Sequence, residues 1–101
     1  MLINHEELTN RIIGSVKRNL PYGHFRVFYF GSRVSGKATS RSDLDIGIEA
    51  DSSVPFGIMA RIRGELEEIP ILQRLDVVDF SRVPKDFATE ARKNIETIYE
   101  Q

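Results

Sequence analysis

Apolar residues recur along this chain with two periods, that of a helix and that of a strand. From Asn4 to Leu20 they are spaced three or four positions apart, which predicts an amphipathic helix with Asn4 as its N-cap. The next apolar stretch, HFRVFYFGS, is rich in aromatic and β-branched residues and predicts a strand buried on both faces. Residues 33–41 are small and polar and suit a turn with a short helix. The segment DLDIGIE then alternates strictly between apolar and polar positions, which predicts a second strand.

The second half of the chain continues the alternation of helix and strand. Residues 55–69 have helical spacing, and residues 72–80 (LQRLDVVDF) predict a third strand. Pro84 suits the first turn of a last helix. Its apolar side would consist of Phe87, Ala91, Ile95 and Ile98. The end of this helix stays open, because ETIYE also has the propensities of a short edge strand.

The composition is that of one globular domain. The 101 residues are 41% apolar and 29% charged, so residues 1–101 are expected to form a single α/β (α+β) domain. We expect a small mixed sheet with helices packed on one face and an open face that holds the active site. With 14 basic and 15 acidic side chains there is no general positive field, and long nucleic acid is not expected as a partner.

The sequence gives no sign of export or of membrane insertion. It contains no cysteine, which excludes a disulfide framework and a thiolate zinc site and fits the cytoplasm. No run approaches the roughly 20 apolar residues that a membrane span needs. We therefore expect a cytoplasmic protein without a membrane partner.

Two carboxylates in the second strand are the first candidate functional residues. Asp43 and Asp45 are two positions apart, so a strand places them side by side on one face. Crowded carboxylates repel one another and lose hydration, which indicates that a cation sits between them. Mg²⁺ is usually held by one or two carboxylates together with substrate phosphates, and a nucleoside triphosphate would supply the phosphates.

A two-ion magnesium site would need a third carboxylate from a neighbouring strand. Asp76 and Asp79 are the candidates, and being three positions apart they point to opposite faces of a regular strand. We favour Asp76, because its apolar neighbours make an unpaired carboxylate costly, whereas Asp79 is placed to cap the following turn. A β-bulge would reverse this choice.

The turn before the carboxylates is the candidate phosphate site. Gly31 and Ser32 end a strand, and such a turn offers backbone N–H groups and a hydroxyl to an anion. Arg33 and Arg41 flank the same loop and are placed to neutralise phosphate charge. A Gly-Ser turn alone is usually only a turn, and each arginine alone is more often solvated. Their combination with the carboxylates is what favours nucleotide binding.

These motifs together resemble the signature of the polymerase-β superfamily of nucleotidyltransferases. Gly31-Ser32, residues 33–42, Asp43-x-Asp45 and a later strand acid occur in the order of that signature. GSRVSG and SDLDIGI most resemble the minimal nucleotidyltransferases, the MNT or MntA-like proteins. The resemblance implies a nucleotidyltransferase fold, Mg²⁺ held by Asp43, Asp45 and Asp76, and NTP phosphates bound near Gly31 and Ser32.

The resemblance also implies a partner and a reaction. Proteins similar to this one are commonly encoded beside a HEPN-domain toxin and adenylylate it on a tyrosine, so AMP transfer from ATP by an antitoxin is expected. Two alternatives remain open: an antitoxin that neutralises its partner by binding alone, and nucleotidyl transfer to a small molecule. Exposed apolar residues on the first or last helix could support assembly with the partner or with a second copy.

Overall fold

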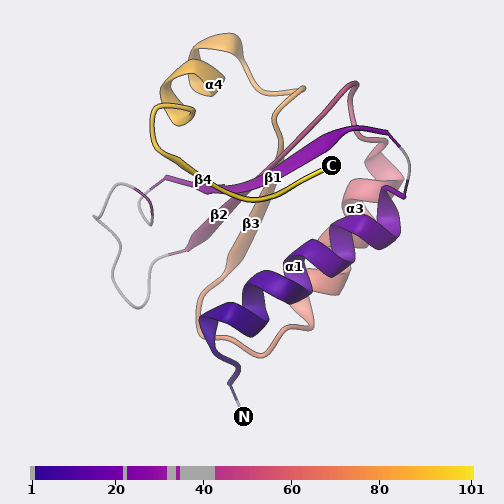
Figure 1. The fold of residues 1–101 in the computed structure, drawn as a ribbon, viewed down its shortest axis with the longest axis vertical. Helices are drawn as coiled ribbons and strands as arrows, with labels where there is room; N and C mark the ends of the chain where they lie inside the picture. The colour runs from indigo at the N-terminus through magenta and orange to yellow at the C-terminus, as the bar shows by residue number, and fades with distance from the viewer. Residues whose placement is uncertain (1, 22, 32–33, 35–42) are drawn as a thin grey trace.

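The computed structural model describes residues 2–21, 23–31, 34 and 43–101. In chain order the elements are α1 (His5–Asn19), β1 (Phe25–Phe30), β2 (Leu44–Ala50), α3 (Phe56–Glu67), β3 (Leu75–Asp79), α4 (Lys85–Ala91) and β4 (Ile95–Glu100) (Figure 1). The short helix expected within residues 33–41 falls outside this range apart from position 34. None of the helices in the described ranges is long and apolar enough to cross a membrane.

The four strands form one mixed sheet in the order β3-β2-β1-β4. Strand β1 is antiparallel to both β2 and β4, whereas β2 and β3 are parallel. The segment after α4 takes the strand alternative, with Ile95 opposite Phe30. The helical reading was therefore wrong for Ile95 and Ile98, because α4 ends at Ala91.

Helices α1 and α3 cover one face of the sheet. The side chain of Asn4 accepts the N–H of Glu7 at 2.8 Å and caps α1 as the sequence predicted. Residues of α1, α3, β1, β2 and β3 share one apolar core, to which the alternating side chains of β2 contribute Leu44, Ile46 and Ile48. The two helices are also joined by Glu65, which accepts a hydrogen bond from buried Ser15 at 2.7 Å.

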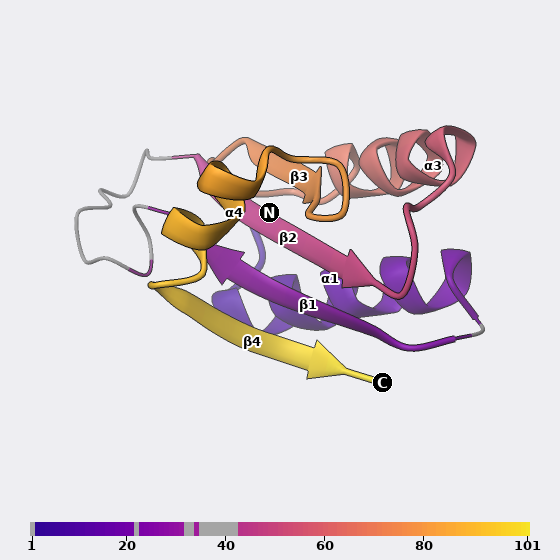
Figure 2. The same cartoon turned by 90° about the horizontal axis from the view of Figure 1, so that it is seen from above.

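Helix α4 lies on the opposite face of the sheet from α1 and α3, as Figure 2 shows. Phe28 and Phe30 of β1 pack there with Phe80 and with Ala88 of α4. The mixed α/β fold class is confirmed, with the addition that α4 covers part of the face that was expected to be open. Gly47 makes this packing possible, because a Cβ atom there would lie 2.8 Å from Cε1 of Phe80.

Candidate active site

Strands β2 and β3 bring two of the predicted carboxylates side by side. Asp45 and Asp76 are register partners in the parallel pair, so their side chains leave neighbouring strands toward the same face. Neighbouring strands are about 4.8 Å apart, which puts the two carboxylates within reach of one ligand. Asp43 lies just before β2 and, like Asp76, is exposed, whereas Asp45 is half-buried.

The electrostatic environment of Asp45 is unfavourable to its own charge. Burial raises the pKa of Asp45, and the negative charges of Asp76 and then of Asp43 raise it further. The fold therefore holds three carboxylates close enough to repel one another. A bound cation would remove this repulsion.

Asp79 has a different role, which its hydrogen bonds define. Its carboxylate accepts hydrogen bonds from the backbone N–H of Val54 at 2.8 Å and from that of Ser81 at 3.0 Å. It also accepts hydrogen bonds from the hydroxyl of Ser81 at 2.7 Å and from Nε of Arg82 at 3.2 Å. Burial alone would raise the pKa of Asp79, but these hydrogen bonds together hold it below its usual value. Asp79 is buried and caps the turn after β3, as predicted.

Glu49, a further acid on the face of Asp45, is already neutralised. Arg26, its register partner on β1, donates to it at 2.7 Å, and Arg92 at the end of α4 donates to its other oxygen. Burial would raise the pKa of Glu49, but the bonds from Arg26 and Arg92 hold it below its usual value. Asp45 and Asp76 have no such ion pair among the described residues.

Gly31 lies directly beside Asp45. Its φ is +79°, a conformation that favours glycine, and a Cβ atom there would collide with Oδ2 of Asp45. The structure therefore places one member of the predicted phosphate turn next to the carboxylates. The other predicted residues of this turn, Ser32, Arg33 and Arg41, lie outside the described residues.

A cavity of about 490 Å³ opens beside these groups. Gly31, Asp45 and Asp76 line it together with Phe30 of β1 and Phe87 of α4. This volume lies within the range of small-molecule sites. The last helix thus contributes a wall of the site, which the pattern of apolar residues did not indicate.

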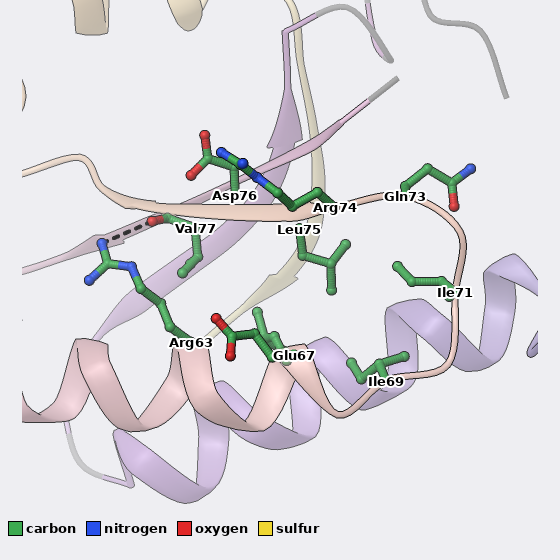
Figure 3. A pocket seen from close by; sticks show the side chains of 10 residues that line it. Arg63, Glu67, Ile69, Ile71, Gln73, Arg74, Leu75, Asp76 and Val77 are labelled. Atoms are coloured by element: carbon green, nitrogen blue, oxygen red, sulfur yellow. Dashed lines mark hydrogen bonds between the residues drawn. The ribbon is translucent and has the colours of Figure 1, made fainter. Parts of the chain in front are cut away.

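Asp76 also lines a second cavity, of about 480 Å³, between α3 and the edge strand β3 (Figure 3). Arg63 of α3 donates to the backbone carbonyl of Val77 at 3.1 Å and covers part of this edge. Arg74 also lines this cavity and is two positions before Asp76 (Figure 3). The sequence interpretation missed Arg74, although the period of the strand could have placed it on the face of Asp76.

The described residues do not form a complete metal cage. Among them, no three His, Asp or Glu side chains are gathered closely enough to hold an ion. The role of Asp43, Asp45 and Asp76 as metal ligands therefore stays a prediction. The structure supplies their common placement at one end of the sheet.

Comparison with known proteins identifies the class of this site. Residues 25–101 match the family described as "Polymerase beta, Nucleotidyltransferase", which covers most of the chain, including the Gly31 turn and all three carboxylates. The chain belongs to this family, and the resemblance seen in its motifs is confirmed. The reaction class is therefore nucleotidyl transfer.

A particular curated relative is the probable protein adenylyltransferase MntA of Haemophilus influenzae. The two sequences are 34% identical over 77 residues, which are 76% of this chain and 68% of the relative. A solved structure of a toxin-antitoxin with AMP-PNP matches with a TM-score of 0.70 at 18% identity, over 90% of this chain and 72% of that one. The structure of a tri-AMPylated Shewanella oneidensis HEPN toxin with MNT antitoxin matches with a TM-score of 0.67 at 16% identity, over 93% and 71%. At these low identities, the matches to the two solved structures show that this chain shares their fold.

Proposed function

We propose that this protein transfers AMP from ATP to a hydroxyl group of a HEPN-domain partner protein and acts as the antitoxin of a toxin–antitoxin pair. The observation that carries the proposal is the register pair Asp45 and Asp76 beside Gly31, on a chain of the nucleotidyltransferase family. The choice of AMP and of a HEPN partner is supported by the MntA relative and by the toxin–antitoxin structures of the same fold. We also propose that the protein acts in the cytoplasm, as expected for a reaction that consumes ATP.

The residues of the site fit Mg²⁺ as the cofactor. The donors are all carboxylate oxygens, the ligands that this hard cation prefers. The raised pKa of Asp45 supports the fit, since its causes include the charges of Asp76 and Asp43 that a cation would offset. We assign Asp43, Asp45 and Asp76 as ligands of a two-ion site, and the exposure of Asp43 and Asp76 leaves both side chains free to turn toward an ion. When bound, Mg²⁺ supplies positive charge for the phosphates of the nucleotide.

The residues of the chain bind and orient the triphosphate. Gly31 and Ser32 offer backbone N–H groups to the phosphates, and Arg33 and Arg41 supply positive charge. The acceptor hydroxyl attacks the phosphorus of the α-phosphate, and the bond breaks between that phosphorus and the oxygen that joins it to the β-phosphate. Pyrophosphate leaves, and the hydroxyl proton passes to a carboxylate of the site. Asp76 is proposed for this step, because it is exposed and lines cavities on two sides of the strand.

The test combines transfer with neutralisation. The double variant Asp43→Asn, Asp45→Asn is co-expressed with the product of the neighbouring gene, and AMP attached to that product is measured by mass spectrometry. The proposal predicts that the variant stays folded, transfers no AMP and no longer neutralises the partner. Transfer at the normal rate would contradict it. Neutralisation that survives without AMP transfer would show that the antitoxin acts by binding alone.

A further inference from the structure

The cavity at the active site is lined by two unlike kinds of group. The carboxylates of Asp45 and Asp76 lie in its lining together with Gly31, and α4 adds the carboxylate of Glu90. The apolar part of the lining consists of the rings of Phe30 and Phe87 and the side chains of Val78 and Ala91. Phosphates and a cation do not need apolar groups, so the apolar lining suits a different part of a ligand.

Phe87 is exposed but its ring is held in position. It is 45% exposed, and it meets the ring of Phe30 nearly at a right angle, with 6.2 Å between centroids. A second ring, that of Phe80, lies 6.1 Å from it. Exposing a large aromatic side chain costs free energy, and packing against two other rings holds the ring of Phe87 in place although nearly half of the residue stays exposed.

Phe30 connects the exposed ring to the carboxylates. It is the register partner of Asp45 across β1 and β2, and it directly precedes Gly31. A ligand whose charged end lies at Asp45 therefore needs to extend past only one side chain to reach Phe87. In Figure 2 the end of β1 and helix α4 lie next to each other at the same end of the sheet.

We propose that the nucleobase of the NTP stacks on Phe87, so that α4 forms the base subsite of the active site. This inference rests on the proposed function, because it takes the phosphates to lie at the carboxylate end. A nucleobase has a flat apolar face, and stacking on an aromatic side chain is tolerant of which base is present. Asn94 also lines the cavity, and its amide offers both a donor and an acceptor to the edge of the base.

A ring of the acceptor protein is the competing occupant. The base is the better fit, because it is joined to the α-phosphate through one sugar and must lie within a molecule's length of Asp45. A cavity of about 490 Å³ with carboxylates and rings in one lining matches a small molecule. An acceptor ring arrives on a separate chain, and nothing ties its position to Phe30.

The test measures binding without the partner, by calorimetry, with two probes: Mg²⁺ with ATP and Mg²⁺ with inorganic tripolyphosphate. Phe87→Ala is expected to weaken ATP binding roughly 5- to 100-fold and to leave tripolyphosphate binding unchanged. Phe87→Trp should retain ATP binding. Phe87→Leu keeps an apolar side chain but no ring, and its loss of ATP affinity should be nearly as large as that of Phe87→Ala. The matched control is Phe56→Ala, which removes an aromatic side chain that is 73% exposed on α3 and does not line the cavity.

Any other result of these measurements would contradict either the base subsite alone or the base subsite together with the proposed function. Unchanged ATP affinity in Phe87→Ala, with wild-type protein that binds both probes, contradicts the base subsite and leaves the proposed function standing. If ATP affinity is unchanged and the same variant, in a transfer assay with the partner present, raises only the KM for the acceptor protein, the ring belongs to the acceptor. An equal loss for ATP and tripolyphosphate shows that Phe87 acts through the fold. Wild-type protein that binds neither probe contradicts the proposed function together with this inference.

Discussion

Gly31 approaches the carboxylate of Asp45 so closely that a Cβ atom on Gly31 would collide with Oδ2 of Asp45. The same glycine has a φ of +79°, which L side chains rarely adopt. Position 31 therefore needs glycine for two reasons. The turn requires a positive φ, and the proposed metal ligand Asp45 leaves no room for a Cβ atom.

Replacing Gly31 separates these two requirements. Gly31→Ala is expected to lower the free energy of unfolding by about 1–2 kcal/mol through strain at positive φ. It should also slow transfer roughly 100-fold, because it displaces Asp45. Urea denaturation and initial rates of labelling would measure the two effects.

Gly23→Ala is the matched control for this variant. Gly23 also has a positive φ, +92°, but nothing lies within 4 Å of the position that a Cβ atom would take. This control should lose similar stability and keep its activity. Equal activity of the two alanine variants would show that the contact with Asp45 is irrelevant to transfer.

Replacing Asp79 by Asn is expected to reduce stability, whereas replacing Asp76 by Asn is expected to abolish activity. Asp79→Asn should lower the free energy of unfolding by about 2–3 kcal/mol, because an amide cannot accept from Val54 and Ser81 through both of its atoms. Asp76→Asn should change stability by less than about 0.5 kcal/mol, since Asp76 is exposed, yet abolish transfer. Chemical denaturation and labelling of both variants in parallel would check this. Transfer by Asp76→Asn at the wild-type rate would exclude Asp76 from the site.

Removing the charge of Asp45 is expected to stabilise the protein. Burial and the charges of Asp76 and Asp43 disfavour its ionised form, so Asp45→Asn should raise the melting temperature by about 2–5 °C at neutral pH. Mg²⁺ should raise the melting temperature of the wild type and leave that of the variant unchanged. Thermal unfolding with and without Mg²⁺ measures both. A variant that is less stable, or that responds to Mg²⁺ like the wild type, would contradict the metal assignment.

The pH dependence of stability has opposite signs at the two kinds of carboxylate. The lowered pKa of Asp79 means that its contribution is fully present above the ordinary aspartate pKa of about 3.9 and is lost as the pH falls through the lowered value. The raised pKa of Asp45 means that stability decreases as the pH rises from about 3.9 through the raised value. As the pH is lowered below the ordinary aspartate pKa, the urea concentration at the midpoint of unfolding should fall less steeply in Asp79→Asn than in the wild type. In Asp45→Asn the decrease between pH 4 and neutral pH should be smaller than in the wild type. An unchanged slope in either variant would refute the corresponding assignment.

Strand periodicity predicted much of the fold and of the site. It placed Leu44, Ile46 and Ile48 in the core, and it put Asp76 and Asp79 on opposite faces of the third strand. Alternation alone did not say which of the two joins Asp45. That choice came from the apolar neighbours of Asp76 and from the position of Asp79 at the end of the strand. The helical spacing and the Asn4 cap likewise predicted α1 within a residue at each end.

The last 20 residues show what the sequence could not decide. Ile95 and Ile98 continue the spacing of Phe87 and Ala91, so a longer helix fits the local pattern as well as a strand does. Pairing with β1 decides in favour of the strand, and that pairing joins residues far apart in the sequence, from Phe30 with Ile95 to Arg26 with Glu100. The cavity wall formed by Phe87 depends on the same long-range packing, on Phe30 and Phe80.

The most direct test of the central claim uses the purified protein with Mg²⁺, the product of the neighbouring gene, and ATP labelled in parallel reactions at the α- or the γ-phosphate. Nucleotidyl transfer breaks the bond between the α- and β-phosphates, so α-label should become covalently attached to the partner and γ-label should leave with pyrophosphate. The Asp45→Asn variant should attach neither label. Attachment of γ-label, or of no label to a partner that still co-purifies with the protein, would contradict the account.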